Sequence, residues 1–200
     1  MNLMSNDCSA GLIYKKVLET TYKNPLVFKK IYFDDFIKLI KNYDIINFSN
    51  YELKKDNDWH FRIEVDNIFT AELNHYRFDK TVDGIKKNFP DVYSNKIWEY
   101  IVEKYETRLL RMNERPIFIG HYDYGQLGKW DPTLSVKKLN DFCSFLKKSN
   151  LPCLIISELP IEETESETFK IIRFSRKNGD EFIKNKKEII EKINFLNEKF

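Results

Sequence analysis

The chain has few of the residues that mark several common protein classes. It holds three cysteines, six glycines and six prolines in 200 residues. Three cysteines without a C-x-x-C pair make neither a disulfide framework nor a structural zinc site, and they favour a reducing compartment. The G-x-G-x-x-G, P-loop and G-x-S-x-G motifs are also missing, so neither a glycine-rich phosphate loop nor a serine hydrolase is indicated.

An excess of one charge is missing too. The 33 basic and 31 acidic side chains give a net charge of +2, and lysine pairs alternate with acids, so we expect no nucleic-acid partner. The longest apolar run, 151–159, is too short to span a bilayer. Asp7, Lys15 and Lys16 interrupt any N-terminal apolar run, so we expect no signal peptide and a cytoplasmic location.

What the chain does contain is a series of short apolar runs that alternate with helical patterns. These patterns predict strands at 3–5, 61–66, 68–73, 116–120, 152–157 and 169–174, and helices at 9–20, 34–43, 94–112, 131–148 and from 180 on. A weak helix is predicted at 79–90 and a polar, turn-rich stretch at 43–58. Apolar strands between helices imply a sheet covered on both faces. We therefore predict one α/β domain over 1–200, a three-layer, Rossmann-like open sheet, mostly parallel, with helical elaboration.

One cysteine falls at a strand-to-helix turn. The first predicted strand ends in Ser5-Asn6-Asp7, Cys8 follows, and a helical pattern begins at once. Unpaired N–H groups and the helix dipole at such a turn stabilise a thiolate, so Cys8 is a candidate nucleophile. The alternative is that Cys8 only packs in the core, as free cysteines often do. Ser5, Asn6 and Asp7 are candidate substrate-binding residues at the same turn.

Two histidines are candidate bases for this thiol. His75 lies where a predicted strand runs into a loop, and His121 follows the 116–120 strand, beside Tyr122. Ligands of open α/β sheets bind beyond the carboxyl ends of the strands. If the 3–5 and 116–120 strands are adjacent and parallel, Cys8 and His121 open onto one crevice, where Tyr122 is a candidate substrate contact. Each histidine could equally be structural, and no H-x-x-x-H or H-E-x-x-H spacing predicts a metal site.

A pair of arginines marks the 94–112 helix. Arg108 and Arg111 stand three residues apart in EKYETRLLRMN. Helical spacing of three puts both guanidinium groups on one face, where they can bind a phosphate or a carboxylate. Pairing with neighbouring glutamates of the same helix explains them equally well.

Four segments together carry a family resemblance. MSNDCSAGLIYKKV, NPLVFKKIYFDDFIKLIKN, FTAELNHYRFDK and EKYETRLLRMNERPIFI occur in that order. The sequence thereby resembles, over about its first 120 residues, a bacterial family of unknown function whose members are often labelled exopolysaccharide or capsule biosynthesis proteins. It is more distantly similar to proteins catalogued as papain-like cysteine peptidases. The resemblance implies roles for Cys8, His75, Arg108 and Arg111. Departures occur at Ser9, Ala10 and Tyr105, where the family pattern has aromatic or glycine residues and a tryptophan.

These observations predict an enzyme of surface-polysaccharide assembly that transfers or hydrolyses acyl groups. Cys8 would attack or hold the acyl group, with His75, or second His121, as base. Backbone N–H groups after Cys8 would stabilise the oxyanion. The arginines would bind the donor or acceptor, a glycan or small molecule, with no tightly bound cofactor and an acyl-CoA as possible donor. Two alternatives stay open: glycosyl or phosphoryl transfer from a nucleotide-linked donor without a cysteine nucleophile, and a non-catalytic component of an assembly complex.

Overall fold

The computed structural model describes residues 1–200 except 8, 19, 21, 28, 57–59, 78, 83–84, 89–90, 162–165, 174–185 and 200. Side chains are also not described at 9, 12, 16–17, 55–56, 60, 74–77, 79–82, 85–88 and 91–97. Cys8 therefore lies outside the described residues, and the side chain of His75 does so as well.

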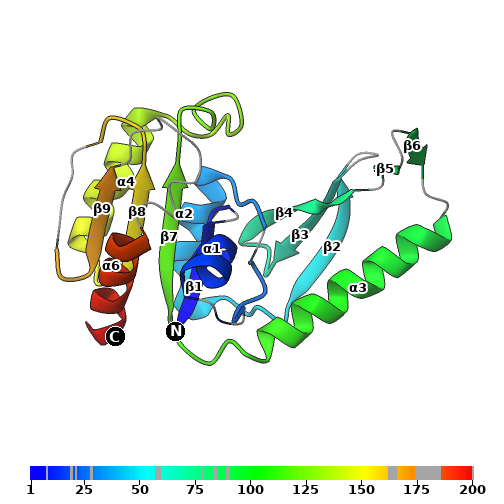
Figure 1. The fold of residues 1–200 in the computed structure, drawn as a ribbon, viewed down its shortest axis with the longest axis horizontal. Coiled ribbons are helices and arrows are strands. Elements are labelled where there is room, and N and C mark those ends of the chain that lie inside the picture. Colours follow the sequence, from blue (N-terminus) through cyan, green and yellow to red (C-terminus); the bar gives the residue numbers. More distant parts are fainter. Residues whose placement is uncertain are drawn as a thin grey trace.

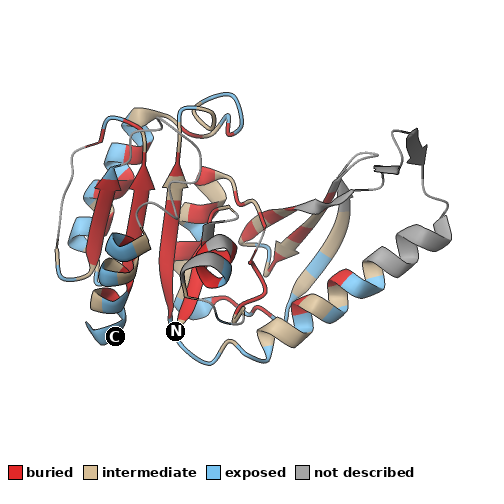
Figure 2. Ribbon diagram, in the orientation of Figure 1, coloured by how far each residue is buried: buried red, intermediate tan, exposed pale blue. Residues whose placement is uncertain are grey.

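A parallel sheet forms the centre of the molecule. Its strands, in spatial order, are β1 (Asn2–Ser5), β7 (Pro116–Tyr122), β8 (Cys153–Ser157) and β9 (Phe169–Arg173). Every neighbouring pair is parallel. Figure 2 shows buried residues along most of this sheet. The strands are short apolar runs because helices cover both faces, which is the usual setting of a parallel sheet.

Helices cover the two faces as separate layers. One layer holds α1 (Ser9–Leu12), the π-helix η1 (Ile13–Val17) and α6 (Lys186–Lys199), and the other holds α2 (Phe33–Asn42) and α4 (Val136–Lys148). Figure 1 shows α1 and α6 in front of the sheet and α2 and α4 behind it. Alternate strand residues face opposite layers: Leu3 packs with the front layer and Met4 with the back layer. The predicted three-layer α/β class is confirmed.

A second, antiparallel sheet lies beside the first. It contains β2 (Tyr51–Asp56), β3 (His60–Val65) and β4 (Phe69–Arg77), in that order. It is followed by the hairpin of β5 (Asp79–Val82) and β6 (Ile85–Asn88) and by the long helix α3 (Asp91–Leu109). The predicted pairing of β3 with β4 across Asp66-Asn67 is confirmed, and both turn residues have positive φ, 53° and 54°, as tight hairpin turns require.

The second sheet and the back layer share one hydrophobic core. Phe61 and Ile63 of β3 and Tyr105 of α3 belong to the same buried cluster as Met4 and Phe118 of the parallel sheet. A short 3-10 helix, η2 (Tyr43–Ile45), follows α2. In Figure 1, α3 runs along the second sheet away from the parallel sheet. Burial of this cluster fixes the two sheets to each other.

Two segments differ from the sequence prediction. The stretch at 79–90, predicted as a weak helix, contains β5 and β6. The stretch at 43–58, predicted as turn-rich, contains β2, in which Tyr51 and Leu53 are only half-buried. The strand has the polar composition YELKKD. Because neither face is strongly apolar, the sequence lacks the clear alternation of apolar and polar residues that predicts a strand.

The start of α2 depends on a residue far along the chain. The helix predicted at 34–43 begins at Phe33 in the structure, and the Phe33 N–H donates to Asp131 Oδ2 at 2.7 Å. Asp131 was predicted to begin the next helix, but α4 starts only at Val136, with the hydroxyl of Ser135 accepting a hydrogen bond from the N–H of Lys138. The 4% exposed Asp131 is therefore a long-range N-cap.

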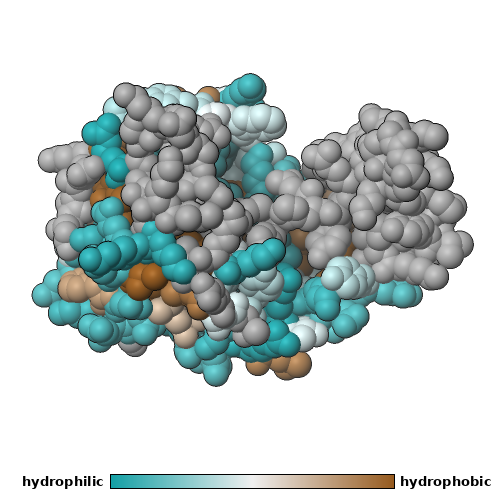
Figure 3. Space-filling model, in the orientation of Figure 1, coloured by the Kyte–Doolittle hydropathy of each residue, from teal (hydrophilic) through white to brown (hydrophobic). Residues whose placement is uncertain are grey.

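The described surface is mainly polar in the view of Figure 3. Teal, hydrophilic side chains cover most of the described atoms on that face, and the brown areas are small. Within the part of the chain that the structure describes, no helix has both the length and the apolar character needed to cross a membrane.

Candidate active site

The chain segments that follow β1 and β7 meet at one edge of the parallel sheet. The two strands are adjacent and parallel, as the sequence argument required. Beyond the end of β1, the side-chain amide of Asn6 donates to His121 O at 3.0 Å, and its oxygen accepts from His121 N at 2.8 Å. This side chain imitates a paired strand residue, so the turn after β1 is fixed against the end of β7.

Asp7 and His121 form a hydrogen-bonded pair at this edge. Asp7 Oδ2 lies 2.7 Å from His121 Nδ1, and the two side chains are 22% and 17% exposed. Burial by itself lowers the pKa of His121, but the charge and hydrogen bond of Asp7, followed by Asp123 and Glu158, outweigh it and raise the pKa above its usual 6.5. The imidazole is therefore held in one orientation and is more basic than a free histidine.

Ser5 shapes the turn that presents Asp7. Its hydroxyl donates to Asp7 O at 2.6 Å and accepts from the Ala10 N–H at 3.0 Å. Ser5 and Asn6 are 1% and 4% exposed, and the hydrogen bonds just given are made within the protein. The structure thus places these two predicted substrate-binding residues as supports of the turn. The Ala10 N–H, one of the groups predicted to bind an oxyanion after Cys8, is occupied by Ser5.

Tyr122 lies on the opposite face of β7 from His121. Its side chain is fully buried, and its ring packs edge-on against Phe33 with centroids 5.6 Å apart. Burial raises the pKa of this phenol well above 10. Adjacent strand residues point to opposite faces, so Tyr122, next to His121, enters the back-layer core. It therefore does not face the sheet edge where it was predicted to contact substrate.

The two predicted arginines occupy different surroundings. Arg108 is half-buried on α3, with Nη1 donating to Val27 O at 3.3 Å and its guanidinium carbon 5.3 Å from the Tyr22 ring centroid. Arg111 is exposed in the turn after α3. The helix ends at Leu109, so the helical spacing that placed both guanidinium groups on one face does not extend to Arg111.

The candidate bases are not equally described. His121 is placed by its contact with Asp7, whereas for His75 the structure gives only a backbone position in β4 of the second sheet. The prediction that Cys8 is the nucleophile falls outside the described residues, directly after Asp7 in the chain.

The sequence argument missed the acidic surroundings of His121. Asp7 was expected to bind substrate and instead contacts the imidazole, and Asp123 and Glu158 were not assigned to the site. A signal was available: an acidic residue stands within two positions of the end of β1, of β7 and of β8. Since these parallel strands are neighbours, their following acids gather at one edge.

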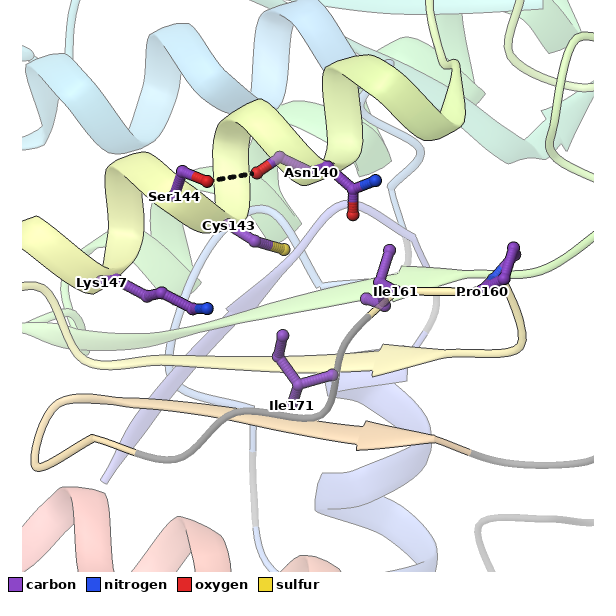
Figure 4. A pocket seen from close by; sticks show the side chains of 7 residues that line it. All are labelled: Asn140, Cys143, Ser144, Lys147, Pro160, Ile161 and Ile171. Atoms are coloured by element: carbon purple, nitrogen blue, oxygen red, sulfur yellow. Dashed lines mark hydrogen bonds between the residues drawn. The ribbon is translucent and has the colours of Figure 1, made fainter.

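A separate cavity lies beside α4. Its volume is about 360 Å³, and its lining residues are Asn140, Cys143, Ser144, Lys147, Pro160, Ile161 and Ile171. Figure 4 shows the thiol of Cys143 between α4 and the strands. Burial raises the pKa of Cys143 to about 12 and that of Cys153 well above its usual 9.0, so both thiols are unreactive at neutral pH.

The fold and this edge define a three-layer α/β protein with a carboxylate–imidazole pair at the carboxyl end of its parallel sheet. Comparisons with family models, with curated proteins and with solved structures gave no match. Among the described residues, no group of three or more histidines, cysteines or acids is arranged to hold a metal ion. What the site can do is therefore inferred from its own geometry.

Proposed function

We propose that this protein is a cysteine-dependent enzyme that transfers or hydrolyses acyl groups. The observation that carries the proposal is the 2.7 Å contact between Asp7 and His121, with Cys8 as the next residue after Asp7. An imidazole oriented by a carboxylate is the usual base for a thiol or hydroxyl nucleophile. A surface polysaccharide as the acyl acceptor rests on the sequence resemblance alone.

Each member of the site has a distinct task in this mechanism. An ionised Asp7 can only accept a hydrogen bond, so it holds the proton on His121 Nδ1 and makes Nε2 the basic nitrogen. The same carboxylate, with Asp123 and Glu158, stabilises the imidazolium that forms when Nε2 takes a proton, as the raised pKa of His121 indicates. Cys8 supplies the sulfur.

The reaction has two balanced steps. As His121 takes the thiol proton, the sulfur of Cys8 attacks the acyl carbonyl, a C–S bond forms, and the leaving group departs with the proton from His121. Water or a glycan hydroxyl then gives its proton to His121 and attacks the thioester. The C–S bond breaks, and the proton returns to the sulfur. An acyl ester or thioester, such as an acyl-CoA, supplies the acyl group, and no bound cofactor is needed.

The resemblance favours His75 as the base, whereas the contact with Asp7 favours His121. The two assignments predict different effects of substituting each histidine. His121→Gln and Asp7→Asn should both slow the reaction of Cys8, and His75→Gln should leave it unchanged if His121 is the base. His60→Gln is the matched control, because His60 has no role in either assignment.

The first experiment is alkylation by iodoacetamide across a pH series, followed by peptide mass spectrometry. Cys8 should react with an apparent pKa below the usual thiol value of about 8.5. Cys143 and Cys153 are internal controls, since burial raises the pKa of both, and both should resist alkylation in the folded protein. A Cys8 that reacts like an ordinary thiol, and equally in His121→Gln, would contradict the mechanism.

The second experiment follows turnover of p-nitrophenyl acetate. Wild-type protein should accumulate an acetyl group on Cys8, visible by mass spectrometry, and Cys8→Ala should abolish both the adduct and the turnover. Turnover that persists in Cys8→Ala and disappears in His121→Gln would instead point to acid–base catalysis without a covalent sulfur and would contradict the cysteine mechanism.

A further inference from the structure

Lys29 is a buried cation in the segment between η1 and α2. It is 5% exposed, and its Nζ lies 6.0 Å from the ring centroid of Tyr105. No hydrogen-bond or ion-pair partner of this Nζ is found among the described residues. A buried ammonium is costly unless it is paired, so Lys29, uncompensated among the described residues, is suited to binding an anion.

Arg108 supplies a second positive charge beside it. Its Nη1 donates to the carbonyl of Val27, two residues before Lys29. Burial and, to a smaller extent, the charge of Arg108 together lower the pKa of Lys29 to about 7. A nearby carboxylate would act in the opposite direction, and none contributes. Among the residues that the structure describes, the two cations thus stand together without a counter-ion.

The backbone holds Lys29 firmly in this position. The N–H of Lys29 donates to Leu26 O at 3.1 Å. The next residue, Lys30, exchanges two backbone hydrogen bonds with Glu72 of β4, at 2.9 and 2.7 Å. The N–H of Ile31 then donates to Asn6 O at 2.7 Å. Lys29 is therefore part of a fixed connection between the second sheet and the turn that carries the candidate active site.

We propose that Lys29 and Arg108 form a binding site for a phosphate group. A phosphate dianion neutralises both positive charges, whereas a carboxylate neutralises only one. The planar guanidinium of Arg108 suits two phosphate oxygens at once, and the ammonium of Lys29 is a compact point charge for a third. The half-buried position of Arg108 gives the anion access from solvent. Phosphate binding here does not depend on the chemistry proposed for Cys8.

The test is thermal unfolding of the full chain in inorganic phosphate, with sodium chloride and sodium acetate at equal ionic strength as comparisons. Phosphate should raise the Tm of the wild-type protein in a saturable way, as a ligand of the folded state does. Lys29→Met and Arg108→Gln should each weaken the apparent affinity by about tenfold or more, since each removes a charged hydrogen-bond donor. Lys104→Gln, one helical turn from Arg108 on α3, should bind like the wild type.

One further variant and a folding control make the outcome decisive. Arg108→Lys keeps the charge but loses the planar fork, so it should bind phosphate more weakly than the wild type and more tightly than Arg108→Gln. Lys29→Met fills the same buried volume without a charge, and circular dichroism confirms whether it is folded. The proposal is overturned if phosphate gives no saturable shift, if acetate gives the same shift, or if folded Lys29→Met binds phosphate as the wild type does. Cys8 alkylation in Lys29→Met tests the catalytic proposal separately.

Discussion

The candidate active site and the Lys29–Arg108 pair each enclose a basic side chain, yet their surroundings act on it in opposite directions. At the sheet edge, Asp7, Asp123 and Glu158 raise the pKa of His121 although burial opposes them. At the junction with the second sheet, burial and Arg108 both lower the pKa of Lys29. Burial disfavours both cations. At His121 the neighbouring carboxylates outweigh it, whereas at Lys29 burial dominates and Arg108 adds to it.

Removing the buried charge of Lys29 should produce the largest effect on stability. The folded-state pKa of about 7 lies below the usual 10.5, so the unfolded chain binds the extra proton between these values, and stability falls as the pH drops through that window. Below pH 7 the penalty is constant. We expect Lys29→Met to be more stable than the wild type by on the order of 3 kcal/mol at pH 7 without phosphate.

Urea denaturation at pH 7.0 and pH 9.5 measures this difference. The gap between Lys29→Met and wild type should be largest at pH 7.0 and should shrink at pH 9.5, where Lys29 is neutral in the folded protein. A variant less stable than the wild type at both pH values would show that Lys29 contributes favourable packing or pairing that outweighs its burial.

Asp7→Asn should have the next largest effect and should reverse the shift at His121. Without the carboxylate, burial remains the first influence, and the pKa of His121 should fall. In the wild type the pair stabilises the fold fully below the unfolded value of about 6.5, and this contribution is lost as the pH rises through the raised pKa. The cost of Asp7→Asn should therefore be about 1–2 kcal/mol at pH 5.5 and smaller at pH 8.5.

NMR titration of the imidazole carbons checks the same prediction directly. The resonance of His121 should titrate at lower pH in Asp7→Asn, while those of His60 and His75 serve as references in the same spectra. An unchanged midpoint for His121 would mean that Asp7 is not the charge that sets its basicity.

Glu158→Gln should give the smallest effect. Glu158 is the last of the groups that raise the pKa of His121, and its N–H donates to Tyr122 O at 2.9 Å through the backbone, which the substitution preserves. The NMR midpoint of His121 should move down by less than in Asp7→Asn. A larger shift than in Asp7→Asn would place Glu158, in place of Asp7, as the controlling carboxylate.

The layered fold could be predicted because its signals are local. Apolar runs such as 116–120 mark buried strands, and the adjacency of β1 and β7 then brings the Asp7 turn to His121. Lys29 could not be predicted, because its burial depends on α3 and the second sheet closing around it. The same holds for Asp131, which caps α2 from 98 residues away. Long-range contacts of this kind leave no periodic signal in the sequence.

The orientation of Tyr122 illustrates a smaller limit. The sequence predicts that the strand ends at 120 and that Tyr122 contacts substrate, but β7 continues to Tyr122. The strand is two residues longer than predicted, and within it His121 and Tyr122 point to opposite faces of the sheet. The place where a strand ends therefore decided whether this tyrosine faced substrate or core.

Besides the shared hydrophobic core, Asn6 connects the end of β7 with the segment that leads to the second sheet. Its side chain makes two hydrogen bonds to the backbone of His121, and its carbonyl accepts a hydrogen bond from the N–H of Ile31, in the connection to the second sheet. Because one residue makes both sets of hydrogen bonds, substitution of Asn6 should loosen the end of β7 and the connection to the second sheet together.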